Sequence, residues 1–392
     1  MSKSNSTFTH RICPVCGNNN EDESIYVNDL ATLDGLDMSY RVAECDECGF
    51  IYANYLPKVE QYDSYYSTLS KYDTVESTDN LPEVDLFRTK CAVDFCRPYL
   101  KQNASIADLG CGSGILLNAF YQAGWSEVYG LDPAPSAPNN AHKMFKLTDV
   151  YTGTLEQVAD KLPLPHIDLI CLMGVLEHLP MLRENLEKLV GSLSSEAKVM
   201  IEVPALERFF DDECEPYGEF SLEHIQFFSG STLIQFMSGL GYLPLDISYL
   251  GLPKGTTDSL LCLFSQQAGK KEFVLEKEEI KGYLHHSSMI MNRVVKAIIA
   301  CKGHQFIIYG AGSHTARLLP QLRQAGWQGS LICLVDGNSN LHGKIMDGVK
   351  IESPEIMNDY PLATIIISSF RSEESIEKML KEKLPNRLVT LY

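Results

Sequence analysis

The chain contains two parts in which short apolar runs alternate with stretches of helical periodicity. In the first part, residues 81–250, the apolar runs have the length of strands, and the segments between them repeat apolar residues at helical spacing. This alternation predicts an α/β domain with a parallel sheet covered by helices. The expected strands are residues 105–109, 128–131, 167–172, 198–203 and, further on, 259–265.

The second part begins at Phe306 and repeats the same alternation on a smaller scale. Between the two parts, apolar positions from Ile280 to Ile298 recur with helical period and predict one long linking helix. Residues 306–392 are enough for only one mononucleotide-binding half of a Rossmann fold. The expected order is a strand at 306–309, a glycine turn, a helix at 315–324, a strand at 331–335, a helix from Pro354 and a strand at 363–368.

The first 80 residues have a different texture. Residues 1–53 hold two cysteine pairs among polar residues, and residues 54–80 are rich in tyrosine. For a chain of 392 residues we therefore expect three domains. They are a cysteine module with its tyrosine-rich lead-in at 1–80, the first α/β domain at 81–268, and the linking helix with a Rossmann-like half domain at 269–392.

Composition and charge exclude several classes of partner. The net charge of −18 disfavours nucleic acid and anionic membranes, because the chain has no surplus of cations to replace released counterions. No segment has the pattern of an export signal or a membrane span, so the protein is expected in the cytoplasm. A single diphosphate can still bind, since backbone N–H groups at a helix N-terminus supply local positive potential.

The paired cysteines are expected to bind a metal, because the cytoplasm keeps cysteines reduced. Cys13 with Cys16 and Cys45 with Cys48 form two Cys-x-x-Cys turns, separated by 28 residues and each followed by glycine. Two such turns complete a tetrahedral four-cysteine site with no position left for water, so we expect one structural Zn²⁺ per chain. Reduced pairs without metal and a redox pair are the alternatives.

A glycine-rich loop, Asp108-Leu-Gly110-Cys111-Gly112-Ser-Gly114, follows the first expected strand, and the next strand ends at Asp132. Glycines allow the backbone to approach a ligand at the carboxyl end of a strand, and an acid placed like Asp132 can accept hydrogen bonds from two ribose hydroxyls. A carboxylate at Asp108 repels a pyrophosphate but attracts an ammonium group. The loop therefore favours S-adenosylmethionine over NAD.

This loop resembles motif I of class I methyltransferases, and residues 168–179, with Glu177 and His178, resemble the fourth strand of that fold and the loop after it. The resemblance leaves open whether Glu177 and His178 support the loop or take part in the chemistry. A glycine turn in a sheet that binds no cofactor is the alternative. The cofactor contacts that the resemblance implies are Asp108, Gly110, Cys111, Gly112, Gly114 and Asp132, with Thr154 and Leu155 beside the adenine and Met173 on the fourth strand.

A histidine beside a carboxylate lies downstream, in the segment Phe220-Ser221-Leu-Glu223-His224. Histidine can act as a general base at neutral pH. The residue types alone leave open a catalytic base at His224 or a structural histidine. The acidic run that precedes it, at 211–215, is interpreted as a solvated loop, with attraction of an amino group as the alternative.

The order of these motifs along nearly the whole chain resembles the sugar C-methyltransferases, which act on nucleotide-linked ketosugars. The resemblance implies that His224 removes the proton α to the ketone, that Glu223 is its partner, and that Tyr65 or Tyr66 lines the site. The family often carries a tyrosine three residues before the histidine, where this chain has Ser221. This departure leaves O- or N-methylation open.

A second glycine turn, Gly310-Ala-Gly312-Ser-His314-Thr315, opens the carboxyl-terminal unit, and Asp336 ends its second strand. The unit resembles the nucleotide-sugar-binding domain found ahead of bacterial sugar acyltransferases. That resemblance implies substrate-nucleotide contacts from Gly310, Gly312, His314 and Asp336. A packing domain that braces the catalytic one is the alternative.

Three functions remain open at this point. The first is a methyltransferase for a nucleotide-activated sugar, with carbon methylation slightly favoured. The second is an O- or N-methyltransferase for another small polar metabolite, and the third is a non-catalytic scaffold that keeps the fold. The intact loop from Asp108 to Gly114 argues against the scaffold.

Overall fold

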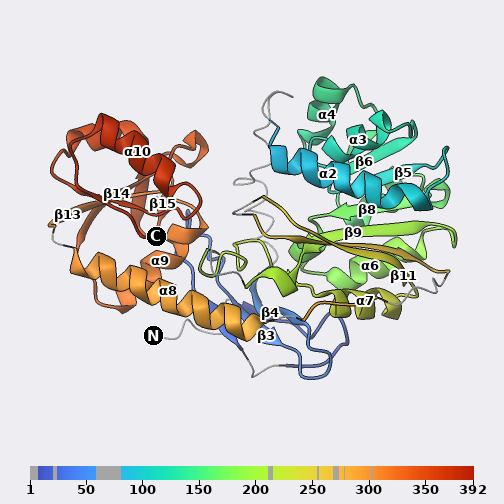
Figure 1. Cartoon of the computed structure of the whole chain (residues 1–392), viewed down its shortest axis with the longest axis horizontal. Coiled ribbons are helices and arrows are strands. Elements are labelled where there is room, and N and C mark those ends of the chain that lie inside the picture. Colours follow the sequence, from blue (N-terminus) through green and yellow to red (C-terminus); the bar gives the residue numbers. More distant parts are fainter. Residues whose placement is uncertain are drawn as a thin grey trace.

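The computed structural model describes residues 8–20, 24–58, 81–210, 215–253, 256–267, 273–277, 279–301 and 303–392. Within these residues the strands form three sheets, one near each end of the chain and one in its middle. In Figure 1 the middle sheet lies on the right, the C-terminal sheet on the left, and the N-terminal sheet below, next to the long helix α8 (Ile280–Ala300).

The middle sheet has seven strands in the order β11-β12-β9-β8-β5-β6-β7. Strands β9, β8, β5, β6 and β7 are parallel, whereas β12 and β11 each run antiparallel to their neighbour. The α/β fold class is confirmed, and the expected strands match the observed ones to within two residues. The bounds are β5 Ile106–Leu109, β6 Val128–Asp132, β7 Val150–Thr152, β8 Leu169–Met173, β9 Lys198–Pro204, β11 Leu243–Leu250 and β12 Ser259–Ser265.

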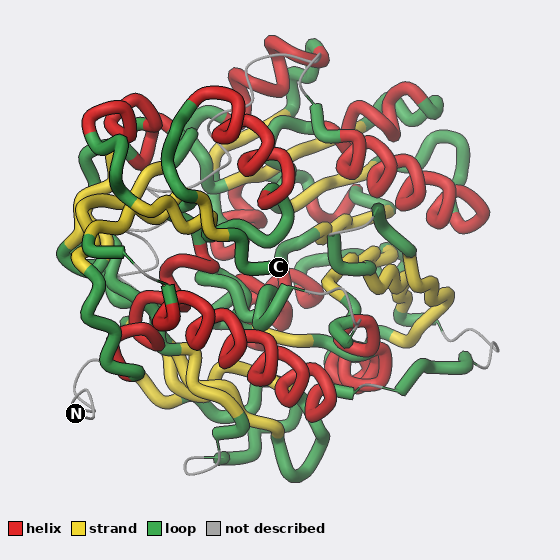
Figure 2. Tube along the Cα trace, turned by 60° about the vertical axis from the view of Figure 1, so that its left-hand side comes forward, coloured by secondary structure: helices red, strands yellow, loops and turns green. Residues whose placement is uncertain are grey.

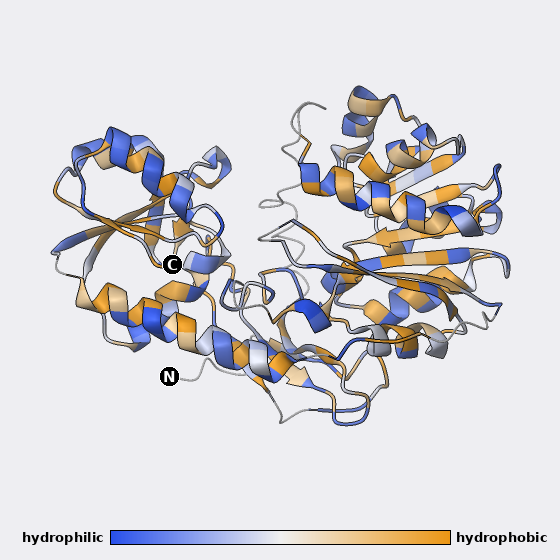
Figure 3. Ribbon diagram, in the orientation of Figure 1, coloured by the Kyte–Doolittle hydropathy of each residue, from blue (hydrophilic) through white to orange (hydrophobic). Residues whose placement is uncertain are grey.

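Helices cover both faces of this sheet (Figure 1), because successive strand residues point to opposite faces. Ile106 packs with helices α2, α3 and α4, and its neighbour Ala107 packs in the other layer, with α6 and α7. In Figure 3 the strands are largely hydrophobic and the helices carry hydrophilic residues among the hydrophobic ones. The helix bounds are α2 Glu83–Cys96, α3 Ile115–Gln122, α4 Ala137–Phe145, α5 Val158–Lys161, α6 Leu182–Gly191 and α7 Gly230–Gly239.

The N-terminal sheet is antiparallel, in the order β1-β4-β3-β2, and its strands were not predicted individually. A fifth strand, β10 (Gln226–Phe227), pairs with β4 although it lies far along the chain. The residues just after His224 therefore belong to the N-terminal sheet. The other bounds are β1 Phe8–His10, β2 Tyr26–Asn28, β3 Tyr40–Glu44 and β4 Ile51–Pro57.

The C-terminal unit follows α8, which has the length that the apolar period predicts. Its sheet has the order β15-β16-β14-β13-β17-β18, with the strands from β16 to β18 parallel. Three short strands, β15, β16 and β18, thus extend the expected half domain. The helix expected from Pro354 is only a short 3₁₀ helix, Pro354–Asp359. The bounds are β13 Gln305–Tyr309, α9 Ser313–Gln324, β14 Ser330–Val335, β15 Ile345–Met346, β16 Val349–Glu352, β17 Thr364–Ile367, α10 Glu373–Lys383 and β18 Leu388–Val389.

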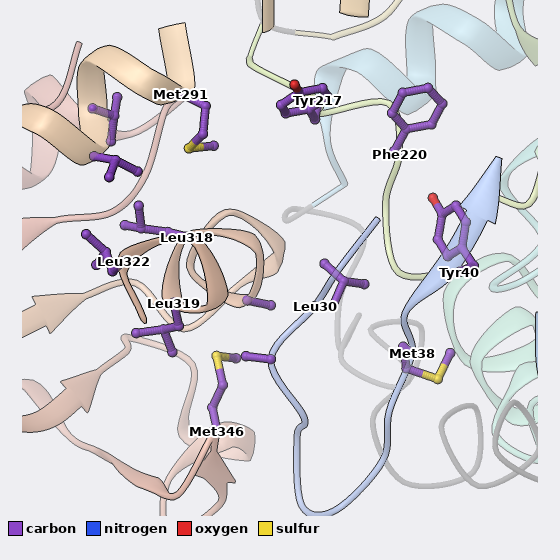
Figure 4. Packing of buried hydrophobic residues seen from close by; sticks show 14 of the residues in the cluster. Leu30, Met38, Tyr40, Tyr217, Phe220, Met291, Leu318, Leu319, Leu322 and Met346 are labelled. Carbon is purple, nitrogen blue, oxygen red and sulfur yellow. The ribbon is translucent and has the colours of Figure 1, made fainter. Parts of the chain in front are cut away.

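One hydrophobic cluster joins the three parts of the molecule. It includes Tyr40 from the N-terminal sheet, Phe220 from the segment before β10, Met291 from α8 and Leu318 from α9 (Figure 4). The first turns of α8 lie against the N-terminal sheet, which Figure 2 shows from a second side. Burial of this shared apolar surface stabilises the contact between the parts. Among the described residues, no helix combines the length and apolar character that crossing a bilayer requires.

Candidate active site

The first glycine loop lies where the strand order of the middle sheet reverses. Strand β5 lies between β8 and β6, and open α/β sheets bind ligands outside the carboxyl ends of strands at such a switch point. Gly110 has a φ of +84°, and a Cβ there would lie 2.6 Å from Val175 Cγ2, so a side chain would force a shift. Gly112 and Gly114 also have positive φ, and Gly114 is the N-cap residue of α3.

Asp108 is a buried acid with no partner for one of its oxygens. The residue is 3% exposed, and its Oδ1 has no hydrogen-bond partner among the described residues. Burial, followed by repulsion from Asp132, raises the pKa of Asp108 to about 8. A ligand that brings a cationic donor satisfies this oxygen, as the ammonium group of S-adenosylmethionine would. The donor set thus fits the cofactor that the loop predicts.

Asp132 lies beside this loop, at the end of β6. Its Oδ2 accepts a hydrogen bond from the N–H of Gly112, and its Oδ1 from the N–H of Ala134, both at 2.8 Å. The N–H of Cys111 donates to the carbonyl of Leu131 at 3.2 Å. Asp132, Gly112 and the buried Cys111 therefore form one turn around the carboxyl ends of β5 and β6.

The predicted adenine contacts lie near the same edge. Thr152 pairs with Asp132, which places Thr154 and Leu155 just beyond the ends of β7 and β6. Thr154 is exposed and caps a short 3₁₀ helix that starts at Leu155. Met173 ends β8, next to β5, and is half-buried. The roles of these three residues toward the cofactor stay predictions.

The structure brings Glu177 and His178 to the predicted catalytic pair. His178 Nε2 lies 3.8 Å from Glu177 Oε1, and His178 Nδ1 lies 3.8 Å from Glu223 Oε2. The rings of His178 and His224 meet edge to face, with centroids 4.9 Å apart. The two segments are joined by a hydrogen bond of 2.8 Å from the N–H of Ile225 to the carbonyl of Glu177. Because Glu177 follows β8 closely, this group lies on the cofactor side of the sheet.

An ion pair between the half-buried Arg88 and the buried Glu202 lies beside this group. Arg88 on α2 donates from Nε and Nη2 to Glu202, at 3.2 and 2.5 Å. Burial and repulsion from Glu202 raise the pKa of Glu177 to about 8, and burial lowers the pKa of His178 despite the nearby Glu223. At neutral pH a protonated Glu177 therefore faces a neutral His178. The sequence analysis did not single out Arg88, since an arginine on an amphipathic helix carries no local signal.

Ser221 has a turn-forming role in this segment. Its Oγ accepts hydrogen bonds from the N–H groups of Glu223 and His224, at 3.2 and 3.0 Å. The serine that replaces the family's tyrosine thus fixes the backbone from which Glu223 and His224 project. Tyr65 and Tyr66 lie outside the described residues, as does most of the acidic run at 211–215, so their predicted roles stay predictions.

The four predicted metal ligands come together in the N-terminal module. The Sγ atoms of Cys13 and Cys48 are 3.6 Å apart, and those of Cys16 and Cys45 are 3.4 Å apart. These separations approach the edge of about 3.8 Å expected for a tetrahedron with Zn–S bonds of about 2.3 Å. The cluster can therefore hold one metal ion.

The four-cysteine cluster contacts helix α6 of the middle domain. Arg183 of α6 donates to the carbonyl of Pro14 at 2.9 Å and to that of Val15. Its guanidinium also lies 5.6 Å from the ring centroid of Phe236. The first cysteine turn is thus fixed to the outer layer of the middle domain.

A second group of potential ligands, Glu177, His178 and His224, also offers ligand atoms within 4.8 Å of one another. Each ring nitrogen of His178 already faces a carboxylate, Glu177 on one side and Glu223 on the other. This arrangement suits proton transfer and hydrogen bonding better than metal coordination.

The second glycine loop repeats the geometry of the first. A Cβ on Gly310, where φ is +105°, would lie 2.6 Å from the carbonyl oxygen of Ser368. Asp336 accepts hydrogen bonds from the N–H groups of Ala311 and Asn338, both at 2.8 Å. Gly312 begins α9. Strand β13 lies between β14 and β17, so this loop also lies at a switch point.

The side chain of His314, a predicted nucleotide contact, is buried within the C-terminal unit. Its Nδ1 is 2.8 Å from Ser368 Oγ, and its Nε2 bonds with the hydroxyl of Tyr392. Burial, with a contribution from Arg317, lowers the pKa of His314 to about 3, so the ring is neutral. Both ring nitrogens thus have partners within the protein, and a role of His314 toward a nucleotide stays a prediction.

Two family profiles match the chain. Residues 88–245 match one described as a methyltransferase domain, and residues 303–386 match one described as C2185-like, N-terminal. No curated protein matches the chain.

Solved structures similar to the chain include the 1,6-didemethyltoxoflavin-N1-methyltransferase of Burkholderia thailandensis. It is 15% identical with a TM-score of 0.41, and the match covers 58% of this chain and 96% of that one. A methyltransferase of Archaeoglobus fulgidus has 16% identity and a TM-score of 0.37, with 52% and 98% covered. One of Anabaena variabilis has 16% identity and a TM-score of 0.36, with 45% and 83% covered.

The profile match begins within α2 and ends within β11, so it contains the first glycine loop and all five parallel strands of the middle sheet, but not β12. Within this part of the sheet, the buried Asp108 Oδ1 has no hydrogen-bond partner among the described residues. The sheet and the loop thus form a class I methyltransferase domain, and the chain is an S-adenosylmethionine-dependent methyltransferase.

Proposed function

We propose that this enzyme methylates a nucleotide-linked ketosugar, at carbon, with His224 as the general base. The observation that carries the proposal is the group formed by His224, His178 and Glu223 beside β8. Two neighbouring imidazoles and a carboxylate can take up and share a proton at neutral pH.

Four parts of the middle domain would hold the cofactor. Asp108 receives the ammonium group, Asp132 the ribose hydroxyls, and Thr154 with Leu155 the adenine, while Met173 borders the methyl-donating end. S-adenosylmethionine supplies an electrophilic methyl group when bound. The glycine loop fixes its position, which lowers the entropic cost of bringing the reacting atoms together.

The chain's own residues would handle the proton. His224 removes the proton α to the ketone, and the negative charge of Glu223 stabilises the imidazolium that forms. His178, held neutral by burial, can share that proton. Glu177, protonated at neutral pH, can donate a hydrogen bond toward developing negative charge on the substrate.

The C-terminal unit would bind the nucleotide end of the substrate, through the backbone of Gly310 and Gly312 and through Asp336. Its support is the likeness of this loop to the first one, including an acid that accepts two N–H groups at the end of the second strand. The four-cysteine cluster would hold Zn²⁺ as a structural ion, because no ligand position is left for water.

O- or N-methylation of another small polar metabolite is the second candidate, and Ser221 supports it. Serine replaces the tyrosine that would serve as an enolate partner, and its Oγ already accepts two backbone N–H groups. In that case His224 would deprotonate a hydroxyl or position an amine.

A thermal-shift screen of nucleotides and nucleotide sugars, with S-adenosylhomocysteine present, tests the proposal. We expect a nucleotide diphosphate sugar to raise the melting temperature further than its free sugar does. Exchange of the substrate's α-proton with deuterated water would then support carbon methylation. Stabilisation by sugars or amines alone, with no effect of any nucleotide, would overturn the nucleotide-sugar proposal and leave the second candidate.

A further inference from the structure

The segment that carries His224 is held at both ends by other parts of the molecule. After His224, Ile225 donates its N–H to Glu177 at 2.8 Å, and its carbonyl accepts the N–H of Ala53 at 2.9 Å. Before it, the carbonyl of Ser221 accepts the hydroxyl of Tyr40 at 2.9 Å. Tyr40 lies on β3 and Ala53 on β4, so the N-terminal sheet makes both of these contacts.

Phe220, the first residue of this segment, is held by the C-terminal unit as well. Its carbonyl accepts two hydrogen bonds, from Arg317 Nη2 at 2.6 Å and from Asn28 Nδ2 at 3.1 Å. Its buried ring stacks on Tyr26 at 4.9 Å and meets Phe227 edge to face at 4.9 Å. Figure 4 shows Phe220 near Tyr40 and Tyr217, at the border of the three parts.

Burial of the charged Arg317 side chain costs free energy, which indicates that this residue has a specific role in the protein. It lies on α9 with 1% of its surface exposed, and its Nε is 3.5 Å from Asn28 Oδ1. Its Nη1 has no hydrogen-bond partner, and no carboxylate lies within 4.0 Å of the guanidinium, in the part of the chain that the structure describes. A buried cation without a paired charge is unfavourable compared with an apolar side chain of similar size.

We propose that Arg317 is a positioning residue, which places the Glu223–His224 pair by holding the carbonyl of Phe220. Through it, the helix that starts at the second glycine loop sets the position of the candidate base in the middle domain. The catalytic meaning of this contact rests on the proposed role of His224. The anchoring itself is independent of the substrate.

Hydrogen–deuterium exchange of the whole chain, followed by mass spectrometry, tests the anchoring in Arg317→Met and Arg317→Lys. In Arg317→Met we expect the peptide spanning 221–227 to exchange at least about tenfold faster, because the loss of the hydrogen bond to the Phe220 carbonyl lets the turn that follows open more often. Arg317→Lys keeps a charged donor and should restore exchange to within about threefold. The peptide spanning 106–118 should be unchanged in both.

Arg323→Met is the matched control, because Arg323 lies on the same helix, is 62% exposed and pairs with Asp347 at 2.8 Å. It should leave the 221–227 peptide unchanged. If Arg317→Met does not fold, Asn28→Ala carries the same test, since it removes the other donor to Phe220, with an expected increase of about threefold.

Three outcomes overturn the proposal: unchanged exchange at 221–227 in a folded Arg317→Met, no recovery in Arg317→Lys, or equal acceleration in the 106–118 peptide. Calorimetry with S-adenosylhomocysteine on the unaltered protein and on Arg317→Met separates this result from the proposed function. Equal affinity is expected in both. A failure of the unaltered protein to bind would overturn the methyltransferase chemistry and leave the anchoring standing.

Discussion

Asp132 and Asp336 hold the two glycine loops in the same way. Asp132 accepts hydrogen bonds from the N–H groups of Gly112, in its loop, and of Ala134, two residues after the acid. Asp336 accepts the corresponding bonds from Ala311 and Asn338, and all four distances are 2.8 Å. Because the two acids belong to separate sheets, we expect each of them to affect the binding of a different ligand.

Replacing each acid by alanine tests this separation. Asp132→Ala should weaken S-adenosylhomocysteine about 10- to 100-fold, since the ribose acceptor and two loop hydrogen bonds are lost, at about 1–3 kcal/mol. Asp336→Ala should leave that affinity unchanged and reduce the thermal shift caused by the nucleotide diphosphate that the screen selects. Calorimetry and thermal shift measure the two effects, and equal losses for both ligands in both variants would contradict two separate sites.

Cofactor affinity should rise with pH because of Asp108. Its pKa of about 8 means that the carboxyl is protonated at neutral pH in the free protein, whereas the ammonium of the ligand favours the ionised form. Binding of S-adenosylhomocysteine should therefore release about 0.9 proton at pH 7, and affinity should rise from pH 6 and level off near pH 8. Calorimetry in buffers of different ionisation enthalpy measures the release, and Asp108→Asn should abolish it. A pH-independent affinity in the unaltered protein would refute this role.

The free energy of unfolding should fall as pH rises from about 4 to 8. The pKa values of Asp108 and Glu177 are both raised to about 8 by burial, so the folded chain binds more protons than the unfolded chain across that window. This contribution is fully present below the ordinary carboxyl pKa and is lost as pH passes 8. Denaturant titrations at several pH values measure the slope. Asp108→Asn and Glu177→Gln should each flatten it, and an unchanged slope in both would count against the buried acids.

His224→Ala should lower kcat about 10²- to 10⁴-fold on the nucleotide sugar that the screen selects, because the general base is lost. Affinity for S-adenosylhomocysteine should stay the same, since His224 is not a predicted cofactor contact. His142→Ala is the control, because His142 is exposed on α4. An unchanged rate in His224→Ala would remove this residue from the chemistry.

Removing the metal should destabilise the middle domain as well as the cysteine module. Cys45→Ser should lower the metal content from one ion per chain toward zero and lower the melting temperature by about 10 °C, because metal binding contributes folding free energy. The middle domain should be destabilised too, because Arg183 of α6 donates hydrogen bonds to the carbonyls of Pro14 and Val15 in the first cysteine turn. Cys91→Ser, in the half-buried Cys91 of α2, is the control. Elemental analysis well below one zinc per unaltered chain would refute the four-cysteine site.

Local patterns in the sequence determined much of this protein. Each strand of the middle sheet that was predicted is a run of residues buried on both faces, so its apolar character alone marks it. The glycine loops, the acids that follow them and the cysteine turns are also short-range features. Where a signal was weak it misled, as at Pro354, where a proline typical of a helix start begins only a 3₁₀ helix.

Only the tertiary structure decided which distant residues meet. Four contacts join segments that are far apart in the chain: β10 with β4, His178 with Glu223, Arg88 with Glu202, and Arg317 with Phe220. The same holds for His314, which lies next to a glycine turn in the sequence but is buried against Ser368 and Tyr392. The physical reason is that periodicity and turn chemistry act over a few residues, whereas a buried charge or histidine takes its role from whichever groups the packed domains place around it.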